Sequence, residues 1–128
     1  MSGNLHSSII RFFTEKMEAH NRVERCVRQN ADGECIFEIQ RKGDLPTLMV
    51  YLSDAYDYGL GEYLSRPRSL GRGDFILIAD PNANFDESVV PRAREDEIGI
   101  GNIKKFMGAL NFRNVWMYDT PDAKKGRR

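Results

Sequence analysis

Three aspartates stand directly after short runs of strand-forming residues, and they are the best candidates for chemistry in this chain of 128 residues. Asp54 follows VYLS, Asp80 follows ILIA, and Asp119 follows WMY. Ligands of open α/β sheets collect beyond the carboxyl ends of parallel strands, so we expect the three carboxylates to converge at one edge. Clustered carboxylates suit Mg²⁺ or Mn²⁺, and such an ion could position a phosphodiester. The sequence therefore predicts Asp54, Asp80 and Asp119 as metal ligands, with Asp54 and Asp80 catalytic.

The alternative is that these aspartates are structural. Aspartate is favoured at helix N-caps and in the turns that follow strands, because its carboxylate accepts hydrogen bonds from nearby backbone amides. Convergence of the three carboxylates, with an arginine within reach, favours the metal site. Aspartates that are each engaged in a cap or a turn favour the structural alternative.

A second candidate is the loop SRPRSLGRGD, which carries Arg66, Arg68 and Arg72 between two predicted strands. Guanidinium groups on a loop loosened by Gly71 and Gly73 suit bidentate contacts to phosphate. We expect this loop to lie beside the ligand-binding edge and to contact the backbone of DNA or RNA. Neighbouring acidic residues offer an alternative, in which the loop is solvated and its arginines form local ion pairs.

The remaining motifs are weaker. Gly99-Ile100-Gly101 precedes a predicted helix with Lys104 and Lys105 in its first turn, and a glycine pair there can admit an anion. This pattern lacks the further glycines and the lysine of known nucleotide-binding loops. The serines have no GxSxG context, and the two cysteines and two histidines lack zinc-finger spacing.

The elements that must position these residues follow from periodicity. Residues 48–52 and 75–79 are apolar without polar alternation, as is typical of strands buried on both faces. A helical pattern at 55–64 between them predicts a βαβ crossover with parallel strands. In this helix we expect Tyr56, Leu60, Tyr63 and Leu64 to face inward. Further elements are predicted as follows: a helix at 4–20, hairpin strands at 23–29 and 34–42 around Asp32-Gly33, a long connection at 80–98, a helix at 99–110 and a strand at 114–118.

The fold class is therefore α/β, with three layers and a mixed sheet that joins an antiparallel hairpin to a parallel part. This element order resembles the restriction-endonuclease-like fold, whose motif places an acidic residue on one strand and Glu-x-Lys on the next. The nearest match is Asp32 followed by Glu38-Ile39-Gln40, with Gln40 at the lysine position and Lys42 two residues further. The resemblance covers about residues 5–80 and implies a Mg²⁺-dependent nuclease or a nuclease-like domain with a decayed motif.

Composition indicates a globular protein: 41% of the residues are hydrophobic and 30% are charged. Nineteen basic residues balance nineteen acidic ones, so bulk charge favours neither a nucleic acid nor a membrane partner. No apolar run approaches the roughly 18 residues of a membrane span. We expect a cytoplasmic protein with one domain at 1–120, a flexible basic tail at 121–128, and two free thiols at Cys26 and Cys35, a hairpin disulfide being the alternative.

Two functional hypotheses follow. The first is a nucleic-acid-directed protein, a small Mg²⁺-dependent nuclease with Asp54 and Asp80 on the metal and the three arginines on phosphate. The second is a non-catalytic module that binds a nucleotide or acts through a protein partner.

Overall fold

The computed structural model describes residues 7–29 and 34–120. The predicted Asp32-Gly33 turn and the basic tail at 121–128 lie outside these residues. The elements, in chain order, are α1 (Ser7–Ala19), β1 (Val23–Gln29), β2 (Ile36–Arg41), β3 (Leu48–Ser53), β4 (Asp57–Tyr58), α2 (Leu60–Leu64), β5 (Phe75–Ile78), β6 (Asn84–Phe85), α3 (Val89–Glu95), β7 (Gly99–Gly101), α4 (Ile103–Ala109) and the 3₁₀ helix η1 (Val115–Met117).

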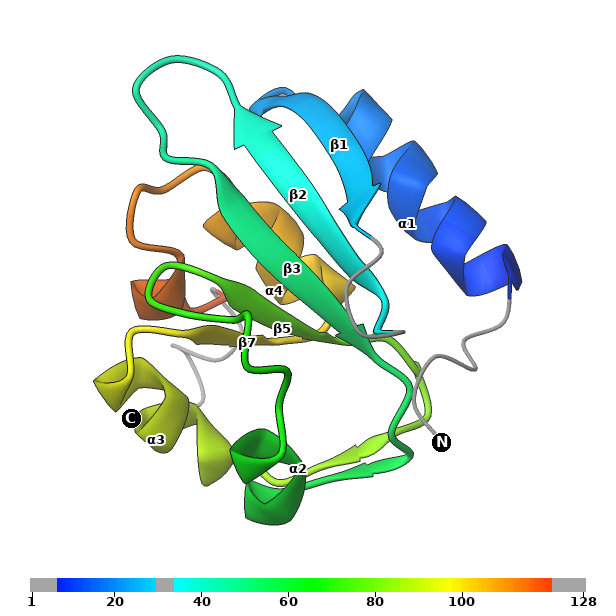
Figure 1. Ribbon diagram of the computed structural model, residues 1–128, viewed down its shortest axis with the longest axis vertical. Helices are drawn as coiled ribbons and strands as arrows, with labels where there is room; N and C mark the ends of the chain where they lie inside the picture. Colours follow the sequence, from blue (N-terminus) through cyan, green and yellow to red (C-terminus); the bar gives the residue numbers. More distant parts are fainter. Residues whose placement is uncertain (1–6, 30–33, 121–128) are drawn as a thin grey trace.

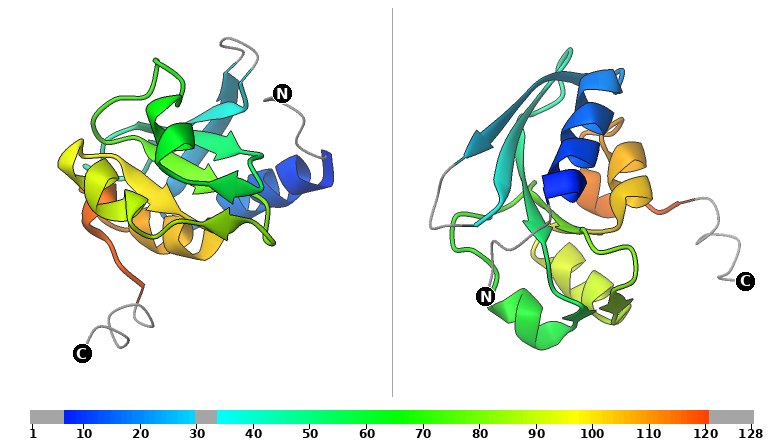
Figure 2. Two further views of the ribbon diagram at one scale, coloured as in Figure 1. Left: turned by 90° about the horizontal axis from the view of Figure 1, so that it is seen from below. Right: turned by 90° about the vertical axis from the view of Figure 1, so that its right-hand side faces the viewer.

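One mixed sheet forms the middle of three layers, in the strand order β1-β2-β3-β5-β7 (Figure 1). The pairs β1–β2 and β2–β3 are antiparallel, whereas β3–β5 and β5–β7 are parallel. Helices α1 and α4 pack on one face of the sheet and α2 and α3 on the other (Figure 2). The predicted three-layer α/β class, with its N-terminal helix and mixed sheet, is confirmed.

The interior strand β5 has side chains buried on both faces, as its uninterrupted apolar sequence predicts. Phe75 and Leu77 join the core beneath α1 and α4, while Ile76 and Ile78 join the core beneath α2 and α3. The predicted division of this strand between two cores is confirmed. Cys26 and Cys35 are free thiols, as expected.

The predicted helix at 99–110 is wrong over its first residues, because Gly99–Gly101 forms the edge strand β7 and α4 starts at Ile103. A Cβ on residue 99 would collide with the Phe75 ring, and one on residue 101 would lie 2.6 Å from Cδ of Lys105. The two glycines therefore let neighbouring side chains lie directly over the strand backbone. A local pattern does not reveal this requirement.

The predicted strand at 114–118 is also wrong, since these residues contain η1 instead. Here the Trp116 carbonyl accepts a hydrogen bond of 3.0 Å from Nε of Arg94, so it pairs with a side chain. The predicted connection at 80–98 is not structureless, because it contains β6 and α3.

The predicted helix at 55–64 is shorter than expected and begins at Leu60. Asp57–Tyr58 form the short strand β4 instead, which pairs in parallel with β6. Tyr63 is buried, whereas Tyr56, Leu60 and Leu64 were expected to face inward and are 55%, 48% and 56% exposed. A helix of five residues makes little more than one turn, so it turns few side chains toward the sheet. Phe12 of α1 is also half-exposed.

None of the helices in the described part of the chain is long and apolar enough to cross a membrane.

Candidate functional site

The parallel pairing of β3 and β5 brings Asp54 and Asp80 to the same edge of the sheet. In the register of these strands Ser53 lies beside Ile78, and the Ala79 amide donates to the Ser53 carbonyl at 3.1 Å. Asp54 and Asp80 follow immediately, at the carboxyl ends of the two strands. Asp80 also makes a turn, because its Oδ1 accepts a hydrogen bond of 2.9 Å from the Asn82 amide.

Asp119 also lies in this region, but it follows the 3₁₀ helix η1 and not the strand that was predicted. Its side chain is 10% exposed. Its Oδ1 accepts a hydrogen bond of 3.2 Å from Nη2 of Arg94 and lies 4.0 Å from Nζ of Lys105. The carboxylate therefore links α3, α4 and the segment after η1 through two cations.

The three aspartates do not form a common cation site. Within residues 7–29 and 34–120, no three histidine, cysteine or acidic side chains come together in a group that could hold a metal ion. Asp119 is engaged in ion pairs and Asp80 in a turn, which corresponds to the structural alternative for both. What remains of the metal hypothesis is the pair Asp54 and Asp80.

The arginine loop lies at the amino-terminal ends of the parallel strands, opposite to the aspartates. The expectation that the loop flanks the aspartates is therefore wrong. Residues 65–74 lead into the first residue of β5, whereas Asp80 follows its last (Figure 1). The physical reason is the crossover. After β3 the chain must return to the end of the sheet where β3 began before it can form the parallel strand β5, and the arginine loop is the last part of that return. Phosphate bound by this loop would therefore lie a strand length from Asp54 and Asp80.

Local ion pairs engage two of the three loop arginines. Nη2 of Arg66 lies 4.0 Å from Oδ2 of Asp96, and Nη1 of the same arginine donates to the Tyr63 carbonyl at 3.1 Å. The Arg66 guanidinium also lies 4.3 Å from the Tyr63 ring centroid. Arg72 forms an ion pair with Glu97. The Tyr63 hydroxyl donates to Asp96 at 2.5 Å and holds the pKa of that carboxyl below its ordinary value. Arg68 is exposed.

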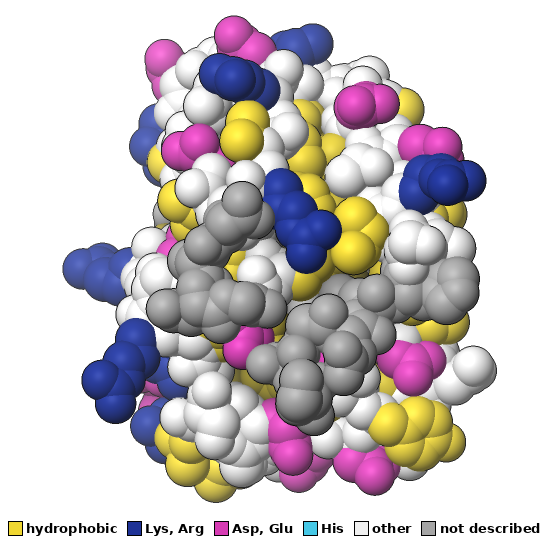
Figure 3. Space-filling view, turned by 45° about the vertical axis from the view of Figure 1, so that its right-hand side comes forward, with side chains coloured by type: hydrophobic (Ala, Val, Ile, Leu, Met, Phe, Trp, Pro, Cys, Tyr) yellow, Lys and Arg dark blue, Asp and Glu magenta, His cyan; other side chains and the backbone are white. Residues whose placement is uncertain are grey.

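A cavity of about 650 Å³ opens where the carboxyl ends of β3, β5 and β7 meet. Its apolar wall includes residues from α1, the three strands, β6 and α3, among them Phe13, Leu52, Ile78, Phe85, Val90 and Ile100. Figure 3 shows one face of the molecule, on which patches of hydrophobic side chains lie between charged ones. A cavity of this size, lined by apolar and polar side chains at the carboxyl ends of parallel strands, lies where small-molecule sites of α/β proteins usually occur.

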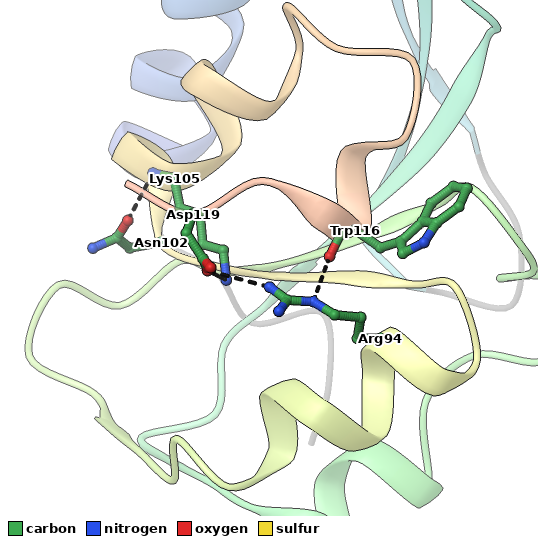
Figure 4. A network of polar contacts seen from close by, with 5 residues as sticks. All are labelled: Arg94, Asn102, Lys105, Trp116 and Asp119. Atoms are coloured by element: carbon green, nitrogen blue, oxygen red, sulfur yellow. Dashed lines mark hydrogen bonds and ion pairs between the residues drawn. The ribbon is translucent and has the colours of Figure 1, made fainter. Parts of the chain in front are cut away.

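The polar residues that line the cavity are Ser8, Asp80, Glu87, Asn102, Lys105, Asp119 and Thr120. Asn102 caps α4, its Oδ1 accepting a hydrogen bond of 2.9 Å from the Lys105 amide. Figure 4 shows Lys105 of α4 and Arg94 of α3 approaching Asp119 from different elements. Lys105 is identifiable from the sequence as a residue that follows a glycine pair. Asn102 is not, because this residue was expected inside a helix.

No match to this chain was found among protein-family models, curated proteins or solved structures. The geometry of the cavity therefore carries the functional argument alone.

Proposed function

We propose that the protein is a non-catalytic binding module that takes a small molecule in the cavity at the carboxyl edge of β3, β5 and β7. The observation that carries this proposal is the cavity itself, about 650 Å³ in volume and lined by side chains from both layers of helices. Its volume lies within the range of roughly 300–1,000 Å³ typical of ligand sites. The engagement of Asp80 and Asp119 in structural contacts also supports this hypothesis over the enzyme.

The test is the binding of a neutral apolar fluorescent probe, N-phenylnaphthylamine, to the purified protein. Ala83 lies in the cavity wall, and Ala83→Trp would place an indole in the space that the probe needs. Ala19→Trp is the matched control, because Ala19 is exposed at the end of α1 and away from the cavity. We expect saturable binding to wild type and to Ala19→Trp, and little binding to Ala83→Trp. Equal binding to both variants would contradict the proposal.

A second candidate is the nucleic-acid-directed role, with Mg²⁺ as cofactor. One observation favours it, namely that the register of β3 and β5 brings Asp54 and Asp80 to one edge. Mg²⁺ commonly binds through one or two protein carboxylates together with substrate phosphates and water. The measurement is cleavage of labelled DNA or RNA with Mg²⁺ or with EDTA. Cleavage that needs Mg²⁺ and is lost in Asp80→Asn supports this role, and no cleavage under either condition rejects it.

A further inference from the structure

The cavity carries more negative than positive charge. Among the described residues that line it, three are carboxylates, Asp80, Glu87 and Asp119, and one is basic, Lys105. The charge of Asp119 is compensated, since its Oδ1 accepts a hydrogen bond of 3.2 Å from Arg94 and lies 4.0 Å from Nζ of Lys105. Within the described part of the chain, no basic side chain forms an ion pair with Asp80 or Glu87. These two carboxylates therefore give the cavity its uncompensated charge.

Both carboxylates belong to the connection between β5 and α3, which forms one side of the cavity. Asp80 is partly buried, and its Oδ1 accepts a hydrogen bond of 2.9 Å from the Asn82 amide. A carboxylate accepts hydrogen bonds at both of its oxygens, so this turn contact leaves Oδ2 of Asp80 for a ligand. Glu87 is exposed just before α3. This side of the cavity thus offers one partly desolvated and one solvated carboxylate to a cation.

Apolar surface lies beside these charges. Ala83 and Phe85 belong to the same connection and also line the cavity. On the α1 side, the half-exposed ring of Phe12 lines the cavity, and Nζ of Lys16 lies 5.3 Å from the centroid of that ring. A cationic group near Phe12 would be repelled by Lys16, whereas one at the connection between β5 and α3 would be attracted. This distribution favours a ligand with a cationic end at the connection and an apolar body along the wall.

We infer, on the basis of the proposed function, that the ligand is a cationic amphiphile, a protonated amine with an apolar body. Its ammonium group binds Asp80, and its body lies along the apolar wall. A partly buried carboxylate attracts a cation more strongly than an exposed one, because water and salt screen it less. Asp80 therefore determines the preference for a cation, and Glu87 adds a weaker attraction.

The experiment compares octylamine, octanol and octanoate, which share a similar apolar body and differ in head-group charge. At about pH 7 the amine is protonated and the carboxylate is ionised. Binding is measured by titration of ¹⁵N-labelled protein in EDTA, which removes divalent cations from Asp80. It is followed at the amide of Asn82, beside the proposed head-group site, and at that of Gly101 in the wall. We expect octylamine to bind most tightly and octanoate least.

Asp80→Asn should weaken octylamine binding about tenfold, as expected for loss of a charged contact, and leave octanol binding unchanged. Asparagine can still accept the hydrogen bond from the Asn82 amide, so the turn is retained. Glu87→Gln should weaken octylamine binding only about threefold, because Glu87 is exposed. Glu24→Gln is the matched control, since Glu24 is exposed on β1 and does not line the cavity.

Octanol binding reports that each variant keeps a folded cavity. If octanol binds as tightly as octylamine, or octanoate binds best, the inference is overturned while the cavity remains a binding site. The inference also fails if Asp80→Asn weakens octylamine binding no more than Glu24→Gln does. If none of the three compounds binds, the proposed function itself fails.

Discussion

Gly108 and Tyr118 are in direct contact, and the phenol occupies the space that a Cβ on residue 108 would need. The same ring stacks on Phe112, with a centroid distance of 5.4 Å. Tyr118 is followed by Asp119, so the glycine in α4 fixes the place where the chain turns back toward the cavity. The absence of one side chain thus helps to position a charged group that lines the candidate site.

Gly108→Ala should therefore destabilise the protein even though alanine is the better helix former. Displacing the phenol is an overpacking effect that typically costs about 1–3 kcal/mol, against a propensity gain of at most about 1 kcal/mol. Gly61→Ala in α2 is the matched control, because its Cβ would meet nothing within 4 Å, and it should be neutral or stabilising. Urea unfolding of both variants checks this, and a Gly108→Ala protein as stable as Gly61→Ala would disprove the packing argument.

Leu77→Ala should lower the free energy of unfolding by about 2–5 kcal/mol, because it leaves a cavity in the core. Leu77 is 3% exposed in an interior strand of the sheet. Leu60→Ala, at a position that is 48% exposed, should cost under about 1 kcal/mol. The measurement is again urea unfolding. A cost for Leu77→Ala as small as that for Leu60→Ala is incompatible with the position of β5.

Arg41→Met should destabilise the fold by about 1–3 kcal/mol, because it removes the donor of one buried and two partly buried hydrogen bonds to carbonyls. The guanidinium of Arg41 is buried and donates to the carbonyls of Pro46 at 2.8 Å, Leu110 at 3.1 Å and Phe112 at 2.7 Å. Burial, and then the charge of Arg113, lower its pKa to about 10.

The control for Arg41 is Arg113→Met. Arg113 is exposed and donates to the Asp44 carbonyl, so its loss should cost less than about 1 kcal/mol. Equal thermal midpoints for the two variants would show that the buried contacts of Arg41 do not stabilise the protein.

Stability should fall as the pH rises above about 9. Burial, and then Glu18, raise the pKa of the Cys26 thiol from 9.0 to about 11, and burial raises that of the Tyr63 phenol to about 12. The unfolded chain therefore loses these protons at lower pH than the folded protein does. For each group, at pH values between its pKa in the unfolded chain and its pKa in the folded protein, the folded state holds more protons. The free energy of unfolding therefore decreases as the pH rises through this interval.

The check is the urea midpoint of wild type and Cys26→Ala between pH 7 and about pH 11. Cys26→Ala should lose less stability over the upper part of this range. An unchanged wild-type midpoint up to about pH 11 would mean that the two groups titrate alike in both states.

If Asp54 and Asp80 bind a divalent cation, the ion should stabilise the protein by mass action. Melting curves of wild type and Asp54→Asn with Mg²⁺, Mn²⁺ or EDTA measure this. The metal hypothesis expects a higher wild-type midpoint with either ion and no shift in Asp54→Asn. Wild-type midpoints that are identical under all three conditions reject the hypothesis and, with it, the metal-dependent nuclease.

Local periodicity predicts the buried strands and the end of the sheet at which they finish. The apolar runs of β3 and β5 predict burial on both faces, and a crossover between them predicts a parallel pair. The same pattern predicts that Asp54 and Asp80 lie at the same end of the sheet, after the carboxyl ends of β3 and β5. These features depend on neighbours within a few residues or on one connection, so local periodicity is sufficient to predict them.

The set of residues that meet at the cavity depends on contacts between distant parts of the chain, which no local pattern contains. Gly99–Gly101 is a strand because it pairs with β5, and its glycines leave room for the Phe75 and Lys105 side chains. Asp119 meets Arg94 and Lys105 from a segment that is not a strand. The arginine loop lies at the amino-terminal end of β5, because the chain must return to that end of the sheet before it forms a strand parallel to β3. Contacts between residues far apart in the chain set these outcomes, and such contacts outweigh local propensity in short segments such as β7 and η1.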